Sequence, residues 1–429
     1  DGRVGPAPTL PDIGSLRLRA VALTEPDLRG YYEGFANSTL WPLYHDAVEP
    51  PVFDRGWWET YREVNRHFAD AAAEVAEEGA AVWVQDYHLQ LVPQMLRELR
   101  PDLLIGFFLH VPFPPPELFM QLPRRLELLR GMLGADLVGF QRPQAAHNVA
   151  QLATKLLGAE DTGDSIVLPD GRVVRTGAFP VSIDVTEMRS LSARPYVRNQ
   201  AHQLRQDLGP HKRVLLSVDR LDYTKGIEHR LTAYSELLRD GLVKVRDTVM
   251  VQVAVPSRER VESYRGLRDR IEREVGRING EYGRVGEPAI HYLNQSFDRA
   301  DLAALYQTTD VMVVTPLRDG MNLVAKEFVA ARPDDNGALV LSEFAGAADE
   351  LTDAFQLNPH DVDGLKETLL RALAADADDL ARRMAAMRAY ITGHDIHAWA
   401  RAYLTALDHS GKLARQLPRR RARPASTRR

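Results

Sequence analysis

Thr315-Pro-Leu-Arg-Asp-Gly-Met-Asn-Leu-Val-Ala-Lys-Glu327 is the most informative segment of this sequence. The apolar run at residues 310–315 is typical of a buried strand, and the apolar spacing from Leu323 to Val329 is typical of a helix. In open α/β sheets ligands bind where a strand passes into a helix, and the N–H groups of a helix start suit an anion. A tight turn with a solvated Arg–Asp pair explains these residues equally well. The choice between a ligand site and an ordinary turn therefore depends on the rest of the chain.

Apolar strands and amphipathic helices alternate along the chain around this stretch, which indicates an α/β protein with parallel sheets. The first block has strand candidates at 16–23, 81–84, 104–109 and 137–140, helical patterns at 57–77, 89–97 and 123–133, and a hairpin within 166–174. The second block has strand candidates at 214–218, 248–255, 289–293, 310–315 and 337–342. A polar, helix-like segment at 190–209 lies between the blocks, and a last helix is expected at 396–407. We therefore expect two α/β domains that join near residues 184–199.

Composition places the chain among globular proteins without a membrane span. Its 429 residues are too many for one ordinary core, and no apolar run reaches the roughly eighteen residues that a spanning helix needs. The chain has no cysteine, which excludes disulfides and thiolate metal sites and fits a cytoplasmic location. We expect the segment 411–429, with eight Lys and Arg and no acidic residue, to be a disordered basic tail rather than a contact for nucleic acid or lipid. The acidic remainder argues against nucleic acid as the main partner.

Several common catalytic motifs are missing from the sequence. It contains no Gly-x-x-x-x-Gly-Lys-Ser/Thr loop, no Gly-x-Gly-x-x-Gly after the first strand, and no His-Glu-x-x-His. It also has no nucleophile elbow of the Gly-x-Ser-x-Gly kind. These absences disfavour a kinase, a dehydrogenase, a metalloprotease and an esterase.

Four polar clusters follow predicted strands directly. They are Gln85-Asp86-Tyr87-His88, His110-Val-Pro-Phe-Pro114, Asp219-Arg-Leu-Asp-Tyr-Thr-Lys-Gly226 and the opening stretch. Each has an ordinary structural explanation, because Asp86 could cap a helix and His110 could be a satisfied core histidine. Four clusters at equivalent positions are harder to explain in that way, so we interpret them as parts of one ligand site.

The cations of these clusters suit phosphate groups. Arg220 and Lys225 are five residues apart in a glycine-containing loop, where Arg can bind a diphosphate as a fork and Lys as a point charge. A diphosphate leaving group needs this compensation because negative charge builds on it as its bond breaks. Arg258, in a turn after another predicted strand, suits a phosphate monoester.

The remaining polar and aromatic candidates suit sugars. Asp86 and Asp319 could accept hydrogen bonds from sugar hydroxyls, and Glu327 could accept from a ribose, as acidic residues do in nucleotide sites. Tyr32 and Trp41 flank a small polar segment and could wall a sugar pocket. Ordinary core packing explains the two aromatic residues equally well.

In this order, the segments resemble the trehalose-6-phosphate synthase family of glycosyltransferases. The matching segments are Asn37-Ser-Thr-Leu-Trp-Pro42, residues 82–89, 105–114 and 136–141, Val218-Asp-Arg-Leu-Asp-Tyr-Thr-Lys-Gly-Ile227, residues 277–283 and 341–347, and the opening stretch. The resemblance covers about residues 16–408. It implies the GT-B fold of the α/β class, with two facing Rossmann-like domains, a cleft between them and a last helix that crosses back to the first domain.

The resemblance also implies an activity and a domain organisation. The family transfers glucose from a nucleotide diphosphate glucose to glucose 6-phosphate with retention of the anomeric configuration, and it needs no metal and no cofactor. UDP-glucose is the favoured donor, with GDP-glucose and ADP-glucose as alternatives, and a homo-oligomer is left open. The expected parts are an acceptor-binding domain at 1–190, a nucleotide-sugar domain at 191–394, a crossover helix at 395–410 and the tail at 411–429.

Roles for single residues follow from the same resemblance. It places Arg220 and Lys225 on the donor diphosphate, Glu327 on the ribose, and Asp319 with the backbone of Gly320, Met321, Asn322 and Leu323 on the donor glucose. His110 is expected near the reacting centre, and Arg220 and Asp86 are counted with it as catalytic. The expected acceptor site consists of Tyr32, Trp41, Asp86 and Arg258, with Arg258 on the acceptor phosphate.

Two departures from the family pattern leave alternatives open. Gln85 stands where the family usually has His, and nothing before Leu16 matches the family's first strand or its Gly-Gly loop over the donor phosphates. We expect that the natural start is missing from the chain as given. The alternative functions are the same fold with another acceptor, glycerol phosphate or an aminocyclitol phosphate, and a non-catalytic regulatory subunit that binds sugar phosphates.

Overall fold

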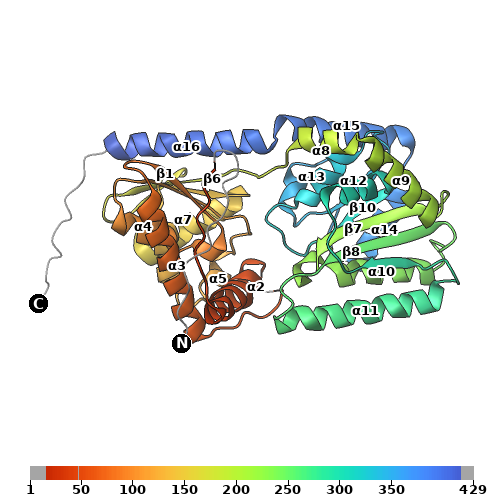
Figure 1. Ribbon diagram of the computed structural model, residues 1–429, viewed down its shortest axis with the longest axis horizontal. Helices are drawn as coiled ribbons and strands as arrows, with labels where there is room; N and C mark the ends of the chain where they lie inside the picture. The colour runs from red at the N-terminus through yellow and green to blue at the C-terminus, as the bar shows by residue number, and fades with distance from the viewer. Residues whose placement is uncertain (1–15, 47, 417–429) are drawn as a thin grey trace, which may run out of the picture. The chain divides into compact units, whose positions relative to one another are not determined.

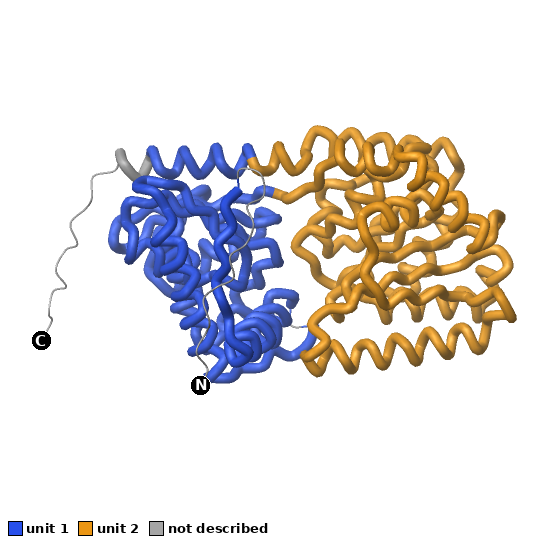
Figure 2. The backbone as a smooth tube through the Cα atoms, in the orientation of Figure 1, with its two compact units in different colours: residues 1–179, 401–429 blue, residues 180–400 orange. Residues whose placement is uncertain are grey.

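The computed structural model describes residues 16–46 and 48–416, which form two compact units (Figure 1). The N-terminal unit takes its residues from Asp1–Phe179 and Arg401–Arg429, and the C-terminal unit is Pro180–Ala400 (Figure 2). The domain boundaries expected from the sequence lie after residues 190 and 394. The predicted N-terminal gap in the family pattern and the tail from residue 417 onward lie outside the described residues.

The C-terminal unit contains a six-stranded parallel sheet. Its strands are β7 (Arg213–Arg220), β8 (Thr248–Val255), β9 (Ile290–Leu293), β10 (Val311–Val314), β11 (Ala338–Ser342) and β12 (Phe355–Leu357). They are arranged in the order β12-β11-β10-β7-β8-β9, which is the doubly wound order of a Rossmann fold. The direction of winding reverses between β7 and β10, and the loops that leave these two strands border the crevice where such folds bind ligands.

Helices cover both faces of this sheet (Figure 1). One face packs against α8 (Val185–Ser192), α9 (Pro195–Leu208), α12 (Arg299–Thr308), α13 (Leu323–Ala331) and α15 (Ala377–Gly393), whose buried side chains form one apolar core with β7, β8, β10 and β11. The other face carries α10 (Ile227–Arg239), α11 (Glu262–Tyr282) and α14 (Val362–Ala374). The strands are apolar without alternation because both of their faces are buried.

The N-terminal unit also has a six-stranded sheet, in the order β1-β2-β3-β6-β5-β4. Its strands are β1 (Ala81–Gln85), β2 (Leu104–Phe108), β3 (Leu137–Phe140), β4 (Glu160–Asp161), β5 (Ser165–Val167) and β6 (Val173–Ala178). The first three and β6 are parallel, and β5 is antiparallel to β6. The turn between β5 and β6 includes Gly171 at a positive φ of 90°, as the predicted hairpin requires.

The helices of the N-terminal unit are α1 (Glu25–Asp27), α2 (Trp41–Tyr44), α3 (Arg55–Val75), α4 (Val92–Leu99), α5 (Pro116–Phe119), α6 (Arg125–Met132) and α7 (Pro143–Leu157). A π-helical segment, Leu28–Leu40, lies against α3. Its Gly30 and Gly34 permit this contact, because a Cβ atom would lie 2.7 Å from Thr60 Oγ1 at the first and 2.6 Å from Trp57 at the second. Asp54 begins α3 by accepting a hydrogen bond from the backbone N–H of Trp57.

The last helix, α16 (Ile396–Gln416), contributes to both units, since the division between them falls after Ala400 (Figure 2). Tyr403 stacks on Trp83 with ring centroids 4.3 Å apart, and its hydroxyl donates to the carbonyl oxygens of Phe107 at 3.1 Å and Leu137 at 3.3 Å. Gly106 and Gly139 make this slot in the sheet, because a Cβ atom at either position would lie 2.6 Å from the Tyr403 side chain. The helix therefore completes the core of the N-terminal unit.

Three details differ from the sequence prediction. Residues 16–23 contain no strand beyond isolated bridge residues, and Leu16 and Leu18 are 62% and 39% exposed, so no sheet neighbour buries their apolar face. The segment 190–209 belongs to two helices, because Pro195 cannot continue α8 and begins α9 instead. The predicted tail is wrong for residues 411–416, which continue α16, helped by an ion pair of 2.7 Å between Lys412 and Asp408 one turn earlier.

None of the helices within the described part of the chain is long and apolar enough to cross a membrane.

We expect Tyr403→Ala to destabilise the N-terminal unit by roughly 3–5 kcal/mol, because it leaves an apolar cavity in the slot. Tyr403→Phe should remove only the hydroxyl contacts and lower the free energy of unfolding by about 1–2 kcal/mol. Leu404→Ala is the matched control on the same helix, since Leu404 is 47% exposed, and its effect should stay within about 0.5 kcal/mol. Urea unfolding, monitored by tryptophan fluorescence, measures all three variants. Equal effects at 403 and 404 would contradict the inference that Tyr403 fills a slot in the sheet.

Candidate active site

The loop after β7 begins the site in the C-terminal unit. Gly226, at its end, has a positive φ of 62°, and a Cβ atom there would lie 2.1 Å from the carbonyl oxygen of Thr315 at the end of β10. Only glycine lets the two loops approach so closely. The backbone N–H of Leu317 donates to the carbonyl oxygen of Thr224 at 2.7 Å, so the loops after β7 and β10 are held together at the switch point of the sheet.

The third and fourth predicted clusters meet at one ion pair. Lys225 Nζ lies 2.6 Å from Asp319 Oδ2, and both side chains are largely buried. Asn322 Nδ2 donates to the same carboxylate oxygen at 3.2 Å. Arg220, the last residue of β7, is exposed at the same end of the sheet. The structure thus brings Lys225 into contact with Asp319, which is 94 residues away in the sequence, and Asn322 contacts the same carboxylate.

Helix α13 starts at this ion pair. Asn322 precedes the helix with a φ of 91°, and its side-chain oxygen accepts from the backbone N–H of Ala325 at 3.1 Å. Gly346 packs against the preceding turn so closely that a Cβ atom would lie 2.1 Å from the carbonyl oxygen of Gly320. Met321 is buried beneath the turn, whereas Leu323 is exposed. The turn is therefore rigid and carries the N–H groups of a helix start, as an anion or sugar site requires.

Glu327 lies one turn further along α13 and is half-buried. The hydroxyl of Tyr306 donates to Glu327 Oε2 at 2.9 Å. Burial raises the pKa of Glu327, and the Tyr306 hydroxyl and the charge of Arg299 oppose this shift only in part. The carboxylate is thus held in position by one donor while it still carries a desolvation cost.

Arg258 belongs to a buried network in the C-terminal unit. Its side chain is 3% exposed and its Nη1 lies 3.3 Å from Asp222 Oδ2, which also accepts from the hydroxyl of Tyr264 at 3.0 Å. The same guanidinium group donates to the Tyr264 hydroxyl. The predicted phosphate-binding cation is therefore anchored by a carboxylate from the loop after β7.

In the N-terminal unit, Asp86 and His110 follow β1 and β2. Asp86 Oδ1 accepts from the backbone N–H of His110 at 3.1 Å, and His110 Nε2 lies 2.8 Å from Gln85 Oε1. Gln141 Nε2, which follows β3, lies 3.5 Å from His110 Nδ1. Burial lowers the pKa of His110, and the charge of Asp86 opposes the shift. Gln85, the departure from the family pattern, thus contacts the predicted catalytic histidine directly.

The two aromatic candidates differ in exposure. Tyr32 is 40% exposed and stacks on His88, with ring centroids 5.6 Å apart and planes inclined by 10°. Trp41 is buried and packs on His45 and Tyr87, whose hydroxyl donates to Asn37. Tyr32 is therefore the more accessible of the two rings, and Trp41 belongs to the buried aromatic cluster around Tyr87.

Comparison with known proteins identifies the sequence family of the chain. Residues 12–409 match the sequence family described as glycosyltransferase family 20. The chain belongs to glycosyltransferase family 20. It is 55% identical over 404 residues to a trehalose-6-phosphate synthase of Mycobacterium avium (strain 104), and the match covers 92% of this chain and 82% of that protein.

Solved structures resemble this family 20 glycosyltransferase along most of its length. A trehalose-phosphate synthase from Burkholderia xenovorans, crystallised in complex with glucose 6-phosphate, is 35% identical with a TM-score of 0.86, covering 90% of this chain and 86% of that one. An E. coli structure bound with UDP-2-fluoro glucose is 38% identical with a TM-score of 0.86, covering 90% of this chain and 85% of that one. The likeness confirms the predicted fold class, α/β of the GT-B type.

Backbone strain marks the predicted site of this glycosyltransferase. Five non-glycine residues of the described chain have a positive φ, and three of them are Asp86, Arg258 and Asn322. Such conformations cost roughly 1–3 kcal/mol each and persist where the surroundings hold them in place, often at binding sites. Hydrogen bonds supply that support, because the side chains of Asp86 and Arg258 bond to neighbouring loops and that of Asn322 bonds to the first turn of α13.

Sequence reasoning missed Arg230, which lies beneath the loop after β7. Its fully buried guanidinium group donates to Asp219 Oδ2 at 2.7 Å, to the carbonyl oxygen of Lys225 at 2.7 Å and to that of Val313 at 3.1 Å. It also missed Asp222 and Tyr264, which anchor Arg258. Asp219 and Asp222 lie within a quoted motif, so their acidic side chains beside Arg220 were the one signal available.

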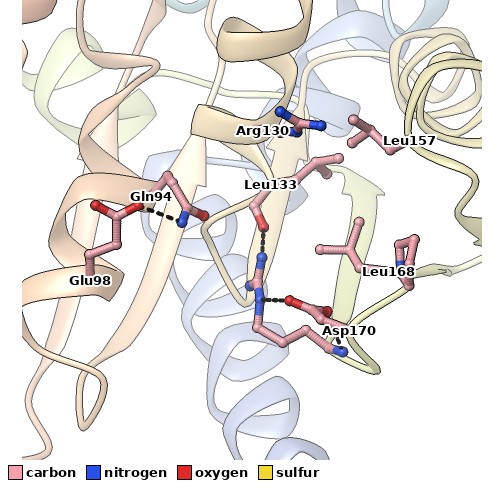
Figure 3. Close-up of a pocket in the computed structure, with 9 residues that line it drawn as sticks. Gln94, Glu98, Arg130, Leu133, Leu157, Leu168 and Asp170 are labelled. Atoms are coloured by element: carbon pink, nitrogen blue, oxygen red, sulfur yellow. Dashed lines mark hydrogen bonds and ion pairs between the residues drawn. The ribbon is translucent and has the colours of Figure 1, made fainter. Parts of the chain in front are cut away.

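A pocket of about 380 Å³ in the N-terminal unit lies apart from the predicted residues (Figure 3). Its walls include Leu133, which precedes β3, and the turn before β6, whereas Asp86 and His110 follow the opposite ends of their strands. Arg172 donates to the carbonyl oxygen of Leu133 at 2.8 Å, which holds that wall together. Among the described residues, no group of three or more His, Asp or Glu is placed to hold a metal ion.

We expect Glu327→Gln to stabilise the unliganded protein above neutral pH. Because the folded-state pKa of Glu327 is raised, the folded state binds this proton more tightly than the unfolded state, and the free energy of unfolding falls as pH rises through that pKa. Glutamine does not ionise, so the variant does not lose this free energy of unfolding. Its melting temperature at pH 8 should therefore rise by about 2 °C or more, while its binding of the nucleotide sugar weakens.

Melting temperatures measured from acidic to alkaline pH test this expectation. The gain from Glu327→Gln should shrink as pH falls through the raised pKa, whereas the exposed control Glu367→Gln should show no such trend. A gain that stays constant with pH would show that the carboxylate charge is not its cause.

Proposed function

We propose that this protein transfers glucose from a nucleotide diphosphate glucose to glucose 6-phosphate, forming α,α-trehalose 6-phosphate and the nucleoside diphosphate. Membership of family 20 and the 55% identity to a trehalose-6-phosphate synthase support this activity. The single structural observation that carries it is the ion pair of 2.6 Å between Lys225 and Asp319 at the switch point. A cation for the diphosphate and a carboxylate for the sugar thus lie side by side, as a diphosphate sugar requires.

The donor is proposed to bind the C-terminal unit. Arg220 and Lys225 compensate the diphosphate charge, and Glu327 accepts from the ribose hydroxyls, held in place by Tyr306. Asp319 and the backbone from Gly320 to Leu323 hold the glucose, on a turn that the packing of Gly346 makes rigid. UDP-glucose is the favoured donor, in line with the UDP-2-fluoro glucose bound to the E. coli relative.

The acceptor is proposed to use Tyr32, Trp41, Asp86 and Arg258. Tyr32 offers a ring face to the sugar, Asp86 accepts from its hydroxyls, and Arg258 pairs with its phosphate. The relative from Burkholderia xenovorans crystallised with glucose 6-phosphate supports a hexose phosphate in this role. Another phosphorylated acceptor, such as glycerol phosphate, would leave the aromatic wall unused.

The reaction is proposed to proceed by attack on the same face that the diphosphate leaves. The acceptor hydroxyl oxygen bonds to the anomeric carbon while the bond from that carbon to the diphosphate oxygen breaks, and the hydroxyl proton passes to the leaving phosphate. Arg220 and Lys225 stabilise the charge that builds on this phosphate. His110, whose pKa is lowered by burial, positions the glucose near the reacting carbon. No metal and no cofactor take part in this proposal.

Fewer observations support our proposals for the location, partners and oligomeric state of the enzyme. A cytoplasmic location fits the lack of cysteine and the phosphorylated substrates. The acidic charge of the chain apart from its last residues argues against a nucleic-acid partner. A homo-oligomer remains an alternative to a monomer, and size-exclusion chromatography with light scattering decides between them.

The activity is tested by mixing the protein with UDP-, GDP- or ADP-glucose and glucose 6-phosphate and measuring nucleoside diphosphate and trehalose 6-phosphate. We expect release with at least one donor, and glycerol phosphate and an aminocyclitol phosphate serve as competing acceptors. Saturable binding of the substrates with no release from any donor would instead support the regulatory subunit.

We expect Arg220→Ala to lower kcat by about 10² or more, because Arg220 stabilises charge that develops on the leaving diphosphate. Arg246→Ala is the matched control, since Arg246 is exposed in the same unit and pairs only with its neighbour Asp247 at 3.3 Å among the described contacts. Steady-state kinetics with the preferred donor measures both variants. An unchanged kcat for Arg220→Ala would remove its assigned role.

A further inference from the structure

Asp222 has no role in the proposed mechanism, yet it is a fully buried carboxylate between two groups that do. It follows β7 and precedes the turn Tyr223–Lys225, which carries the donor-binding lysine. Arg258, the proposed acceptor cation, comes from the loop after β8. A buried charge costs free energy unless it is paired and hydrogen-bonded, so its contacts indicate what it is for.

One carboxylate oxygen of Asp222 shapes the donor loop. Oδ1 accepts from the backbone N–H of Thr224 at 3.0 Å and from the Thr224 hydroxyl at 2.9 Å. The Asp222 carbonyl oxygen accepts from the backbone N–H of Lys225 at 3.1 Å. These bonds fix the tight turn that points Lys225 toward Asp319, 2.6 Å away.

The other oxygen holds the acceptor cation. Oδ2 lies 3.3 Å from Arg258 Nη1 and accepts from the Tyr264 hydroxyl at 3.0 Å. The Tyr264 hydroxyl in turn accepts from Arg258 and places its ring 5.4 Å from the guanidinium carbon. Arg258 has a φ of 50°, a conformation that is rare for a side-chain-bearing residue and needs such anchoring to persist.

We propose that Asp222 is a positioning residue for both substrates, and that each of its carboxylate oxygens sets the binding group for one of them. Oδ1 sets the turn that presents Lys225 to the donor diphosphate, and Oδ2 sets Arg258 for the acceptor phosphate. The inference rests on the proposed function. It identifies Asp222 as the residue that holds the two phosphate-binding groups, Lys225 and Arg258, in fixed positions.

The charge of Asp222 supports this role. Burial alone would raise its pKa, but the charges of Arg258, Arg220 and Lys225 hold the pKa below its ordinary value, so the carboxylate is ionised throughout the neutral range. Of these three cations Arg258 is the one that an ion pair joins to the carboxylate, at 3.3 Å, so Asp222 holds this guanidinium group in position before substrate binds. A binding group that is already held in position needs less reorganisation when its ligand arrives.

Asp222→Asn separates the two halves of this proposal. An amide oxygen can still accept from Thr224 at the Oδ1 position, but an NH2 group at the Oδ2 position meets the N–H groups of Arg258. Loss of a buried charge-assisted hydrogen bond corresponds to about 10- to 100-fold in binding. We therefore expect the KM for glucose 6-phosphate to rise by about tenfold or more, with a much smaller change in the KM for the nucleotide sugar.

Two further variants make the test specific. Thr224→Val keeps the shape but removes the hydroxyl from Oδ1, and it should raise the KM for the nucleotide sugar more than that for glucose 6-phosphate. Tyr264→Phe removes one of the two partners of Oδ2 and should weaken glucose 6-phosphate less than Asp222→Asn does. Asp247→Asn, an exposed carboxylate paired only with Arg246 among the described contacts, is the control and should change neither KM.

Inhibition by inorganic phosphate is a second measurement, and a purely structural role of Asp222 would not change it selectively. Its inhibition constant against glucose 6-phosphate should rise in Asp222→Asn in parallel with the KM, because competition with this substrate reports on phosphate bound at Arg258. Equal changes in the two KM values, or an unchanged acceptor KM, would overturn the proposal.

Direct binding keeps the outcome separate from that of the proposed function. Calorimetric titration of glucose 6-phosphate and of UDP, with melting temperatures to confirm folding, needs no turnover. A wild-type protein that binds both ligands but releases no nucleoside diphosphate would refute the proposed function. In that case the selective loss of glucose 6-phosphate binding in Asp222→Asn still supports the positioning role, and equal loss of both ligands refutes it.

Discussion

The guanidinium group of Arg230 is the contact on which the C-terminal unit's site depends. It joins the end of β7, through Asp219, to the carbonyl oxygens of Lys225 and Val313, and no part of it reaches solvent. Burying an ion pair rarely adds net stability, because desolvation of both charges offsets their attraction. Its value here is geometric, since it fixes the distance between the two strands at which the sheet reverses its winding. The loops that follow these strands then have little freedom, and Lys225 meets Asp319.

Much of the fold could be predicted from the sequence because its strands are buried on both faces. Continuous apolar runs such as those of β8 and β10 leave little ambiguity, and the polar clusters after them mark the ligand end of each sheet. The prediction of a strand at residues 16–23 was wrong because alternation of Leu and Arg specifies a strand only where a neighbour buries one side. The length of α16 was also underestimated, because Lys412, one of the charges that suggested disorder, forms an ion pair with Asp408 one helical turn earlier.

The supporting residues of the candidate site were harder to predict than the residues proposed to face the ligands. The proposed ligand-facing residues lie in recognisable motifs, whereas Tyr264 and Arg230 contact the loops only when helices α10 and α11 pack beneath them. Gly106 gave a weaker hint, since glycine inside a strand often marks a close approach, but its partner Tyr403 lies about three hundred residues away. Motif spacing carries no information about contacts between residues so far apart in the sequence, because these contacts depend on how distant segments pack together.

The packing of α16 on the N-terminal unit affects the order in which the two units fold during translation. The C-terminal unit is a continuous segment, whereas the N-terminal unit, although it begins first, lacks the helix that fills its slot until residues beyond 400 are synthesised. During translation the second unit can therefore reach its native packing before the first. Until then Trp83 and the glycine-lined groove of the nascent N-terminal unit expose apolar surface, which is the kind of surface that chaperones recognise. The order of folding along this chain is thus expected to run opposite to the order of its synthesis.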